Sequence, residues 1–269
     1  MNKTIGFIGS GNMGGAIIGG VISSNLVAPT NITAADISQT ALEGLKEKFG
    51  INTTTDNHQV AANSDILFLS VKPNIYPIVI KEIRESVKAD TIVVAIAAGQ
   101  SINTIETLFE KDIKLAKVMP NTPALVGEGM AAISPNKFLG EDELQDVLAI
   151  FNSIGKAQIV PEYLMDVVTG ISGSSPAYVY MFIEAMADAA VAEGMPRAQA
   201  YEFSAQAVLG SAKMVLETKQ HPGYLKDMVC SPGGTTIAAV CELENKGMRD
   251  AVISAVRTCT HKSREMGKK

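Results

Sequence analysis

The sequence predicts two parts of different class. Residues 1–160 are expected to form an α/β domain on a doubly wound sheet, and residues 161–269 an all-α domain. Three observations predict this. Up to about residue 160, short apolar runs alternate with amphipathic segments, which is typical of a mostly parallel sheet covered by helices. Three glycines follow the first apolar run at a fixed spacing, and no segment beyond Pro161 has the character of a strand.

The chain opens on a strand, a glycine turn and a helix. The strand is the apolar run Ile5–Ile8, and apolar residues recur at helical spacing after the turn. The turn has the G-x-G-x-x-G spacing of a Rossmann-like domain, with the residues Gly9, Ser10, Gly11, Asn12, Met13 and Gly14. The three glycines permit a tight turn, close approach of a pyrophosphate, and close helix–strand packing. This context favours a site for NADH or NADPH over an ordinary glycine-rich turn.

Asp36 ends the second predicted strand, over residues 31–36. It lies about twenty residues past the glycines, where dinucleotide-binding folds place an acid that bonds the adenosine ribose. An acid there suits the two hydroxyls of NADH and repels the 2′-phosphate of NADPH, so NADH is weakly favoured. The alternative is that Asp36 caps the next helix, with Gln39 three residues on. Both readings stay open.

The remaining elements up to residue 160 follow from periodicity and from glycine and proline breaks. The near-continuous apolar runs are expected to be central parallel strands, buried on both faces. We expect helices over residues 38–48 (ending at Gly50), 57–63, 76–87, 101–110 and 141–153, and strands over residues 65–71, 91–97, 114–119, 129–133 and 156–160.

Three of these strands end in unusual peptides. Ligands of doubly wound sheets gather at the carboxyl ends of the strands, so small residues and prolines there indicate a rigid surface for a flat nicotinamide. Any one peptide alone is better explained as ordinary loop chemistry, but three at equivalent positions favour a cofactor site. They contain the candidates Ser70, Val71, Lys72 and Pro73, then Ala97, and then Asn121.

The C-terminal part is expected to consist of helices broken near residues 173–176, 194–196, 221–223, 231–234 and 245–247. Its helix over residues 176–193 is apolar on nearly every face. Such a helix is buried all round. A helical domain of this size buries one only with difficulty, so we expect the helix to lie in an interface between subunits.

Composition excludes several classes of protein. The net charge of −5, with no cluster of Lys or Arg, argues against a nucleic-acid partner. No apolar run is long enough for a membrane span, and the N-terminus does not resemble a signal peptide. Three cysteines and three scattered histidines fit no metal motif, so no metal is expected. Unpaired thiols favour the cytoplasm.

A second candidate site lies at Ser231-Pro232-Gly233-Gly234-Thr235-Thr236, where a short loop opens a helix. Backbone N–H groups at such a start, together with hydroxyl groups, suit a carboxylate. The alternative is helix capping by Ser231 or Thr235. Helix capping would account for one hydroxyl group, but not for three hydroxyl groups next to two glycines.

Over essentially its whole length the chain resembles the pyrroline-5-carboxylate reductase family. The resemblance rests on the glycine turn, on Ser70–Pro73, on Met119–Pro123, on Ser172–Tyr178 and most specifically on Leu225–Thr236. It implies hydride transfer from NADH or NADPH to the C=N carbon of 1-pyrroline-5-carboxylate, yielding L-proline. It also implies a helix-swapped dimer, in some members a decamer of five dimers.

The resemblance further implies roles for individual residues. Ser231 and the N–H groups of Gly234, Thr235 and Thr236 would hold the substrate carboxylate, and the Thr236 hydroxyl would face the ring nitrogen. Asn57 matches a family position near the adenosine ribose. No His, Cys or carboxylate of this loop is an obvious acid, so Thr236 is expected to orient the nitrogen and relay a proton from water.

Two other functions fit parts of the sequence. The 3-hydroxyacid dehydrogenases share the domain order but need a lysine in the first long helix of the helical domain. Here Gly170 and Gly173 match their pattern, and Val179 stands at the lysine position. A regulator that senses NADH without turnover would carry a DNA-binding element or a basic patch. The sequence shows neither, although a non-catalytic metabolic sensor stays open.

Overall fold

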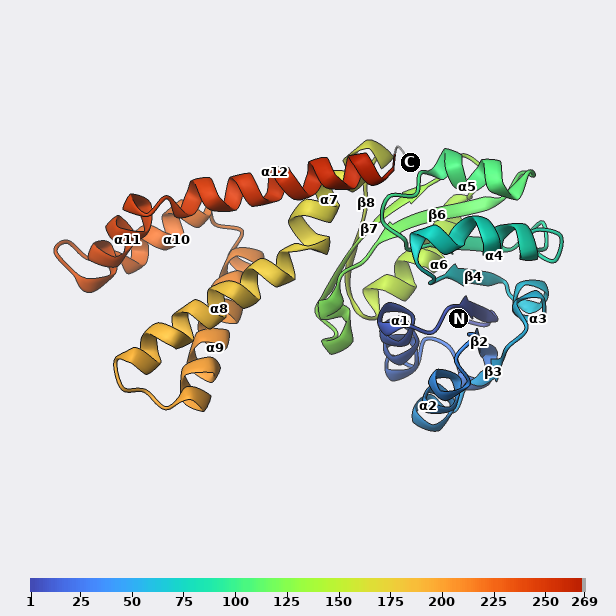
Figure 1. The fold of residues 1–269 in the computed structure, drawn as a ribbon, viewed down its shortest axis with the longest axis horizontal. Helices are drawn as coiled ribbons and strands as arrows, with labels where there is room; N and C mark the ends of the chain where they lie inside the picture. The colour runs from blue at the N-terminus through green and yellow to red at the C-terminus, as the bar shows by residue number, and fades with distance from the viewer. Residues whose placement is uncertain (268–269) are drawn as a thin grey trace. The chain divides into compact units, whose positions relative to one another are not determined.

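The computed structural model describes residues 1–267, which pack as two compact units. The first contains Met1–Ser174 together with the segment from Thr258 onward, and the second contains Ser175–Arg257. The first unit is α/β and the second is helical (Figure 1). The predicted fold class is therefore confirmed. The domain boundary predicted near residue 160 stays a prediction.

One sheet of eight strands organises the first unit, in the order β3-β2-β1-β4-β5-β6-β7-β8. All neighbouring strands are parallel except β6 and β7. The order reverses between β1 and β4, which is the point where doubly wound sheets bind ligands. The strands are β1 (Ile5–Ile8), β2 (Ile32–Ala35), β3 (Asn52–Thr54), β4 (Ile66–Leu69), β5 (Ile92–Ala95), β6 (Lys114–Met119), β7 (Gly129–Pro135) and β8 (Gly155–Ile159).

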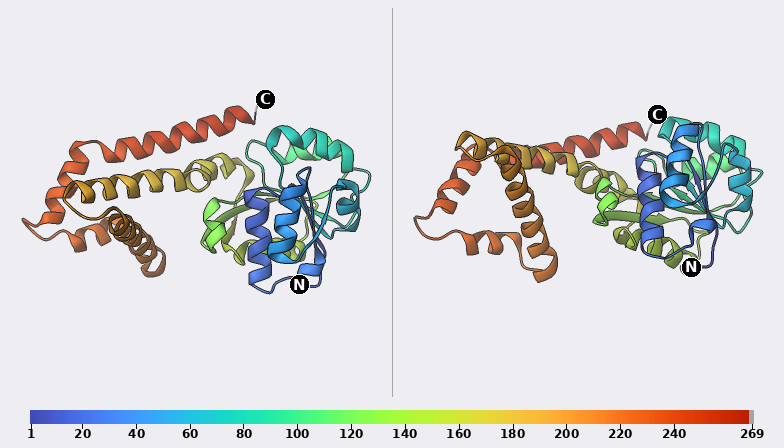
Figure 2. Two further views of the ribbon diagram at one scale, coloured as in Figure 1. Left: turned by 60° about the horizontal axis from the view of Figure 1, so that its bottom comes forward. Right: turned by 90° about the horizontal axis from the view of Figure 1, so that it is seen from below.

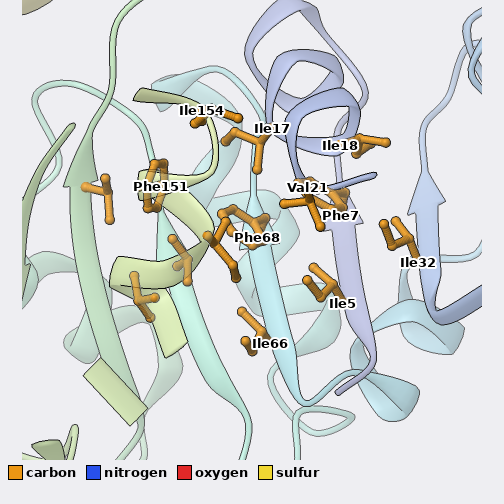
Figure 3. Packing of buried hydrophobic residues seen from close by; sticks show 14 of the residues in the cluster. Ile5, Phe7, Ile17, Ile18, Val21, Ile32, Ile66, Phe68, Phe151 and Ile154 are labelled. Carbon is orange, nitrogen blue, oxygen red and sulfur yellow. The ribbon is translucent and has the colours of Figure 1, made fainter. Parts of the chain in front are cut away.

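Successive strand residues point to opposite faces, so the sheet separates two cores. In β4, Ile66 and Phe68 join one cluster with residues of α1 (Asn12–Ser23), α2 (Gln39–Phe49) and α6 (Glu141–Asn152). The neighbours of these two residues in β4 join the other cluster, with α3 (Asn57–Asn63), α4 (Tyr76–Ile83) and α5 (Ile102–Phe109). Figure 3 shows the first cluster, in which the rings of Phe7 and Phe68 stack with centroids 4.6 Å apart.

The structure differs from the sequence predictions in three elements. The edge strand β3 was missed, because its three residues are polar and form no apolar run. Helix α4 ends at Ile83, whereas apolar spacing extended it to Val87, which is buried in the turn beyond. Strand β7 runs antiparallel to β6, which apolar patterns cannot reveal because they carry no strand direction.

The second unit consists of helices α8 (Ser175–Ala192), α9 (Arg197–Thr218), α10 (Pro222–Val229), α11 (Thr235–Asn245) and the first part of α12 (Met248–Met266). Helices α8 and α9 pack side by side (Figure 2). Only Ala187 of α8 is buried within the chain, whereas the side chains of Tyr180 and Met181 are 59% and 69% exposed. The predicted all-apolar helix is therefore largely uncovered in a single chain.

The end of α12 belongs to the first unit. Ser263 donates a hydrogen bond of 2.6 Å to Asp166 in α7 (Met165–Val168). Cys259 Sγ lies 3.2 Å from Ser174 Oγ, beside a π-helical turn over Thr169–Gly173. The chain therefore leaves the first unit and re-enters it at neighbouring points. No helix within the described residues is both long enough and apolar enough to cross a membrane.

Candidate active site

The glycine turn lies where the sheet order reverses. Gly9 N donates to the carbonyl oxygen of Ala35 at the end of β2, and Ser70 N donates to that of Ile8 at the end of β1, both at 2.8 Å. The ends of β1, β2 and β4 are thereby fixed side by side. The structure thus brings the turn, Asp36 and the peptide Ser70–Pro73 to one edge of the sheet.

The three glycines of the turn are small for different reasons. Gly9 has φ +94°, and a Cβ there would lie 2.8 Å from the Ser70 carbonyl carbon. A Cβ on Gly14 would lie 3.0 Å from the Gly9 oxygen, so this glycine permits close packing of helix and strand. Gly11 has φ −65°, and a Cβ there would meet no protein atom within 4 Å. Nothing within the described part of the chain requires Gly11 to be small, so its backbone is open to close approach by a ligand, as the second glycine of a dinucleotide-binding turn is.

Helix α1 begins at this turn without a side-chain cap. Its N-cap residue is Gly11, and its first turn, with Asn12 and Met13, carries no acidic residue. The first N–H groups of a helix have no partner within the helix and lie at the positive end of its dipole. Such an end binds an anion, which agrees with the phosphate site inferred from Gly11.

Asp36 fastens the turn to the end of β2. One of its oxygens accepts hydrogen bonds from the Ser10 N–H and hydroxyl, both at 2.7 Å, and the other accepts from Ser38 N at 2.9 Å. Burial raises the pKa of this carboxyl, but the hydrogen bonds from Ser10 and Ser38 outweigh it, so the pKa lies below its ordinary value. The helix-cap alternative for Asp36 is wrong, because Ser38 caps α2 and accepts from Ala41 N.

The peptide after β4 packs against the glycine turn. A methyl carbon of Val71 lies 2.9 Å from where a Cβ on Gly9 would stand. The side chain of Lys72 is exposed, and its carbonyl accepts from Ile75 N in the short helical turn that Pro73 begins. Ser70 differs from these neighbours because its buried hydroxyl has no hydrogen-bond partner among the described residues.

Tyr76 connects two strand ends, a role that periodicity did not reveal. Its hydroxyl donates to Leu69 O at 2.7 Å and accepts from the N–H groups of Ile96 and Ala97 at 3.1 and 3.2 Å. Burial raises the pKa of Tyr76 well above its ordinary value, so the hydroxyl stays protonated. The apolar stripe of α4 accounts for the ring of Tyr76 but not for its hydroxyl, and a buried hydroxyl requires a partner.

Two of the predicted asparagines, Asn57 and Asn121, have side-chain partners within the chain. Asn121 donates to Ser172 O at 3.2 Å and accepts from Met130 N at 2.8 Å, and it is 9% exposed. It therefore joins β7 to the π-helical turn. Asn57 is half-buried at the start of α3 and donates to Glu82 at 3.1 Å.

The loop before α11 belongs to the second unit. Gly234 N donates to Ser231 O at 3.0 Å, and Gly233 adopts φ +70°, so the loop is a tight turn. The N-cap of α11 is Gly234, with no side-chain cap. The capping alternative for Ser231 and Thr235 is therefore wrong. Ser231 and Thr235 are exposed and Thr236 is half-buried, so these hydroxyls are available to a ligand.

The doubly wound sheet, its glycine turn and the helical second unit define a dinucleotide-dependent oxidoreductase. Residues 4–99 match the family model described as NADP oxidoreductase, coenzyme F420-dependent. Residues 162–266 match the model described as pyrroline-5-carboxylate reductase dimerisation.

Full-length relatives identify the family. The chain is 53% identical to the pyrroline-5-carboxylate reductase of Escherichia coli, with 100% of both chains covered. It is 46% identical to that of Methanosarcina acetivorans, with 100% of this chain and 99% of the relative covered. A crystal structure of the Plasmodium falciparum enzyme with NADP bound matches with a TM-score of 0.90 and 34% identity, over 99% of this chain and 98% of that one. The chain belongs to the pyrroline-5-carboxylate reductase family.

Proposed function

We propose that this chain reduces 1-pyrroline-5-carboxylate to L-proline, the last step of proline synthesis. The observation that carries the proposal is full-length identity of 53% to a pyrroline-5-carboxylate reductase. The hydroxyls of the loop at residues 231–236, which no helix cap uses, support the same reaction. When bound, NADH or NADPH supplies the hydride that reaches the imine carbon.

The loop before α11 holds the substrate in this proposal. Ser231 and the N–H groups of Gly234, Thr235 and Thr236 bind the carboxylate, because a helix start offers unpaired donors and a positive dipole end. The Thr236 hydroxyl bonds the ring nitrogen and passes it a proton from water. The catalytic contribution of these residues is mainly to hold the imine in one orientation.

The cofactor lies along the carboxyl edge of the sheet. The N–H groups of the glycine turn would hold its phosphates, and Asp36 and Asn57 would bind the adenosine ribose. Asp36 weakly favours NADH over NADPH. The nicotinamide end lies toward the remaining predicted residues, which are Ser70, Val71, Lys72, Pro73, Ala97 and Asn121. The amide of Asn121 already has partners in the chain, so it shapes this surface through β7 and Ser172.

The chain associates with copies of itself through its helical part. The match of residues 162–266 to a dimerisation model and the uncovered apolar side chains of α8 support this. A decamer of five dimers is the finer arrangement we propose. A cytoplasmic location is proposed from the cysteines, since Cys230, Cys241 and Cys259 are all unpaired.

The test is a side-by-side assay of NADH and NADPH oxidation with racemic 1-pyrroline-5-carboxylate, followed by absorbance. Consumption of either cofactor, with proline as the product, is the expected result. The ratio of the two rates measures the preference that Asp36 sets. If both cofactors bind and neither is consumed, the chain is a sensor of the dinucleotide rather than a reductase.

A further inference from the structure

The hydroxyl of Tyr76 lies where the hydrogen bonding between β4 and β5 ends. The last register pair of these parallel strands is Leu69 and Ala95. A parallel ladder continued by one bond would join Leu69 O to Ile96 N, the N–H that follows the register partner. In the structure both groups bond to the Tyr76 hydroxyl, at 2.7 and 3.1 Å. The hydroxyl oxygen therefore takes a place in the ladder, between the two strands.

This hydroxyl is fully engaged inside the protein. A hydroxyl group offers one donor and two acceptor sites. The Tyr76 hydroxyl donates to Leu69 O and accepts from Ile96 N and, at 3.2 Å, from Ala97 N. The side chain is also fully buried. It can therefore act on a ligand only by setting where these backbone groups lie.

A second side chain joins the same two chain segments beyond the strand ends. Gln100 lies just after the peptide that follows β5, and its Nε2 donates to Pro73 O at 3.3 Å, in the peptide that follows β4. Pro73 and Ala97 are both among the residues placed at the nicotinamide end of the cofactor in the proposed function. The separation of the two peptides is thus set twice, by the Tyr76 hydroxyl and by the Gln100 amide.

We propose that the Tyr76 hydroxyl is a positioning group for hydride transfer, because it holds the peptides after β4 and β5 one oxygen atom further apart than a continuous ladder would. The Gln100 amide keeps this separation beyond the strand ends. The inference rests on the proposed function, in which the nicotinamide lies on these two peptides. Their separation then sets the depth of the ring and its alignment with the imine carbon, to which the rate of hydride transfer is sensitive.

The test compares Tyr76→Phe with Thr91→Val as a matched control. Thr91 Oγ1 is also buried and donates to Ser64 O at 2.8 Å, so it joins the segments just before β4 and β5, at the opposite edge of the sheet. Each substitution removes one buried hydroxyl and leaves a backbone carbonyl without its donor. Both variants are therefore expected to melt at a lower temperature, which thermal melts of the whole enzyme measure.

Only Tyr76→Phe is expected to change the reaction. Its kcat should fall about tenfold or more, and its Kd for NADH and NADPH should rise, since misplacement by about 1 Å costs on the order of 100-fold in rate. Its KM for 1-pyrroline-5-carboxylate and its Kd for ADP-ribose, which lacks the nicotinamide ring, should stay unchanged. Thr91→Val should leave all of these constants unchanged. Gln100→Ala, at a half-buried side chain, should repeat the pattern of Tyr76→Phe with a smaller loss of kcat, and it tests the separation if Tyr76→Phe does not fold.

Three results would overturn the assignment. An unchanged kcat in Tyr76→Phe, with a melting temperature lowered as in Thr91→Val, would leave the hydroxyl with a structural role alone. An equal rise in the Kd values for NADH and ADP-ribose would place the disturbance outside the nicotinamide end. A similar loss of kcat in Thr91→Val would assign the effect to stability. If the unsubstituted enzyme turns over neither cofactor, the proposed function fails, and the ratio of the Kd values for NADH and ADP-ribose still decides whether the hydroxyl sets the separation.

Discussion

Thr236 provides the hydroxyl nearest the reacting nitrogen in the proposed substrate position. Replacing it with Ala removes the group that orients the imine and relays a proton. We expect kcat to fall about 100-fold, in the range of lost proton-transfer catalysis, with little change in the Kd for cofactor. Steady-state kinetics and cofactor titration measure the two effects. Thr236→Ser keeps a hydroxyl and should retain most activity, and unchanged turnover in Thr236→Ala would remove this role.

Asp36 gives the glycine turn a dependence on pH. Its folded-state pKa is lowered, so its contribution to stability is present above the unfolded-state pKa of about 3.9 and is lost as pH falls through the folded value. The melting-temperature difference between the unsubstituted enzyme and Asp36→Asn should therefore be constant near neutral pH and shrink below about pH 4. Melts across this range measure it, with the exposed Asp112→Asn as control. A difference independent of pH contradicts the expectation.

Single residues were predictable where their chemistry is local. The glycine turn was predictable because the spacing of its glycines indicates where the backbone turns, packs closely and admits a ligand. The hydrogen-bond partner of Asp36 was not predictable, because Ser10 comes close to it only when β1 and β2 pair. The hydroxyl of Tyr76 and the amide of Asn121 form hydrogen bonds with segments that are distant in the sequence. Apolar periodicity can indicate that such residues are buried, but not which groups they bond.

At the scale of elements, α1 packs closely against the turn after α6. A Cβ on Gly20 would lie 1.7 Å from a methyl carbon of the buried Ile154. Gly20→Ala is therefore expected to lower the free energy of unfolding by about 1–3 kcal/mol through overpacking. Gly44 in α2 has open space around its Cβ position, so Gly44→Ala should raise it by about 0.5–1 kcal/mol. Denaturant unfolding of both variants measures the two changes in the free energy of unfolding. Equal changes for Gly20→Ala and Gly44→Ala would contradict the packing argument.

Most elements were predictable because their apolar spacing matches one structure only. The buried strands β1, β4 and β5 are continuous apolar runs. The breaks between the helices of the second unit contain glycine or proline, except the break before α10, which ends where Pro222 begins the helix. Strand β3 was not predictable, because its stability comes from pairing with β2 and not from its own residues. The direction of β7 was not predictable either, because it depends on the loop that connects β6 to β7, and that loop has no apolar periodicity.

For the whole molecule, the exposed apolar face of α8 has a consequence in solution. We expect light scattering to give a mass of at least two chains. Met181→Glu places a charge on this face and should shift the mass toward one chain. The control Asn103→Glu adds the same charge on the exposed surface of α5 in the first unit and should leave the mass unchanged. A monodisperse monomer of the unsubstituted protein at low concentration would contradict burial of α8 between subunits.

Because the end of α12 returns to the first unit, the helical unit is an insertion within one fold, over residues 175–257. The chain segments on either side of the insertion are in contact, since Cys259 Sγ lies 3.2 Å from Ser174 Oγ. A short glycine linker from residue 174 to residue 258 would therefore excise the insertion and keep every strand of the sheet. Truncating the chain after residue 174 would instead remove the end of α12, and with it the hydrogen bond from Ser263 to Asp166. The dinucleotide module is thus separable by splicing but not by truncation.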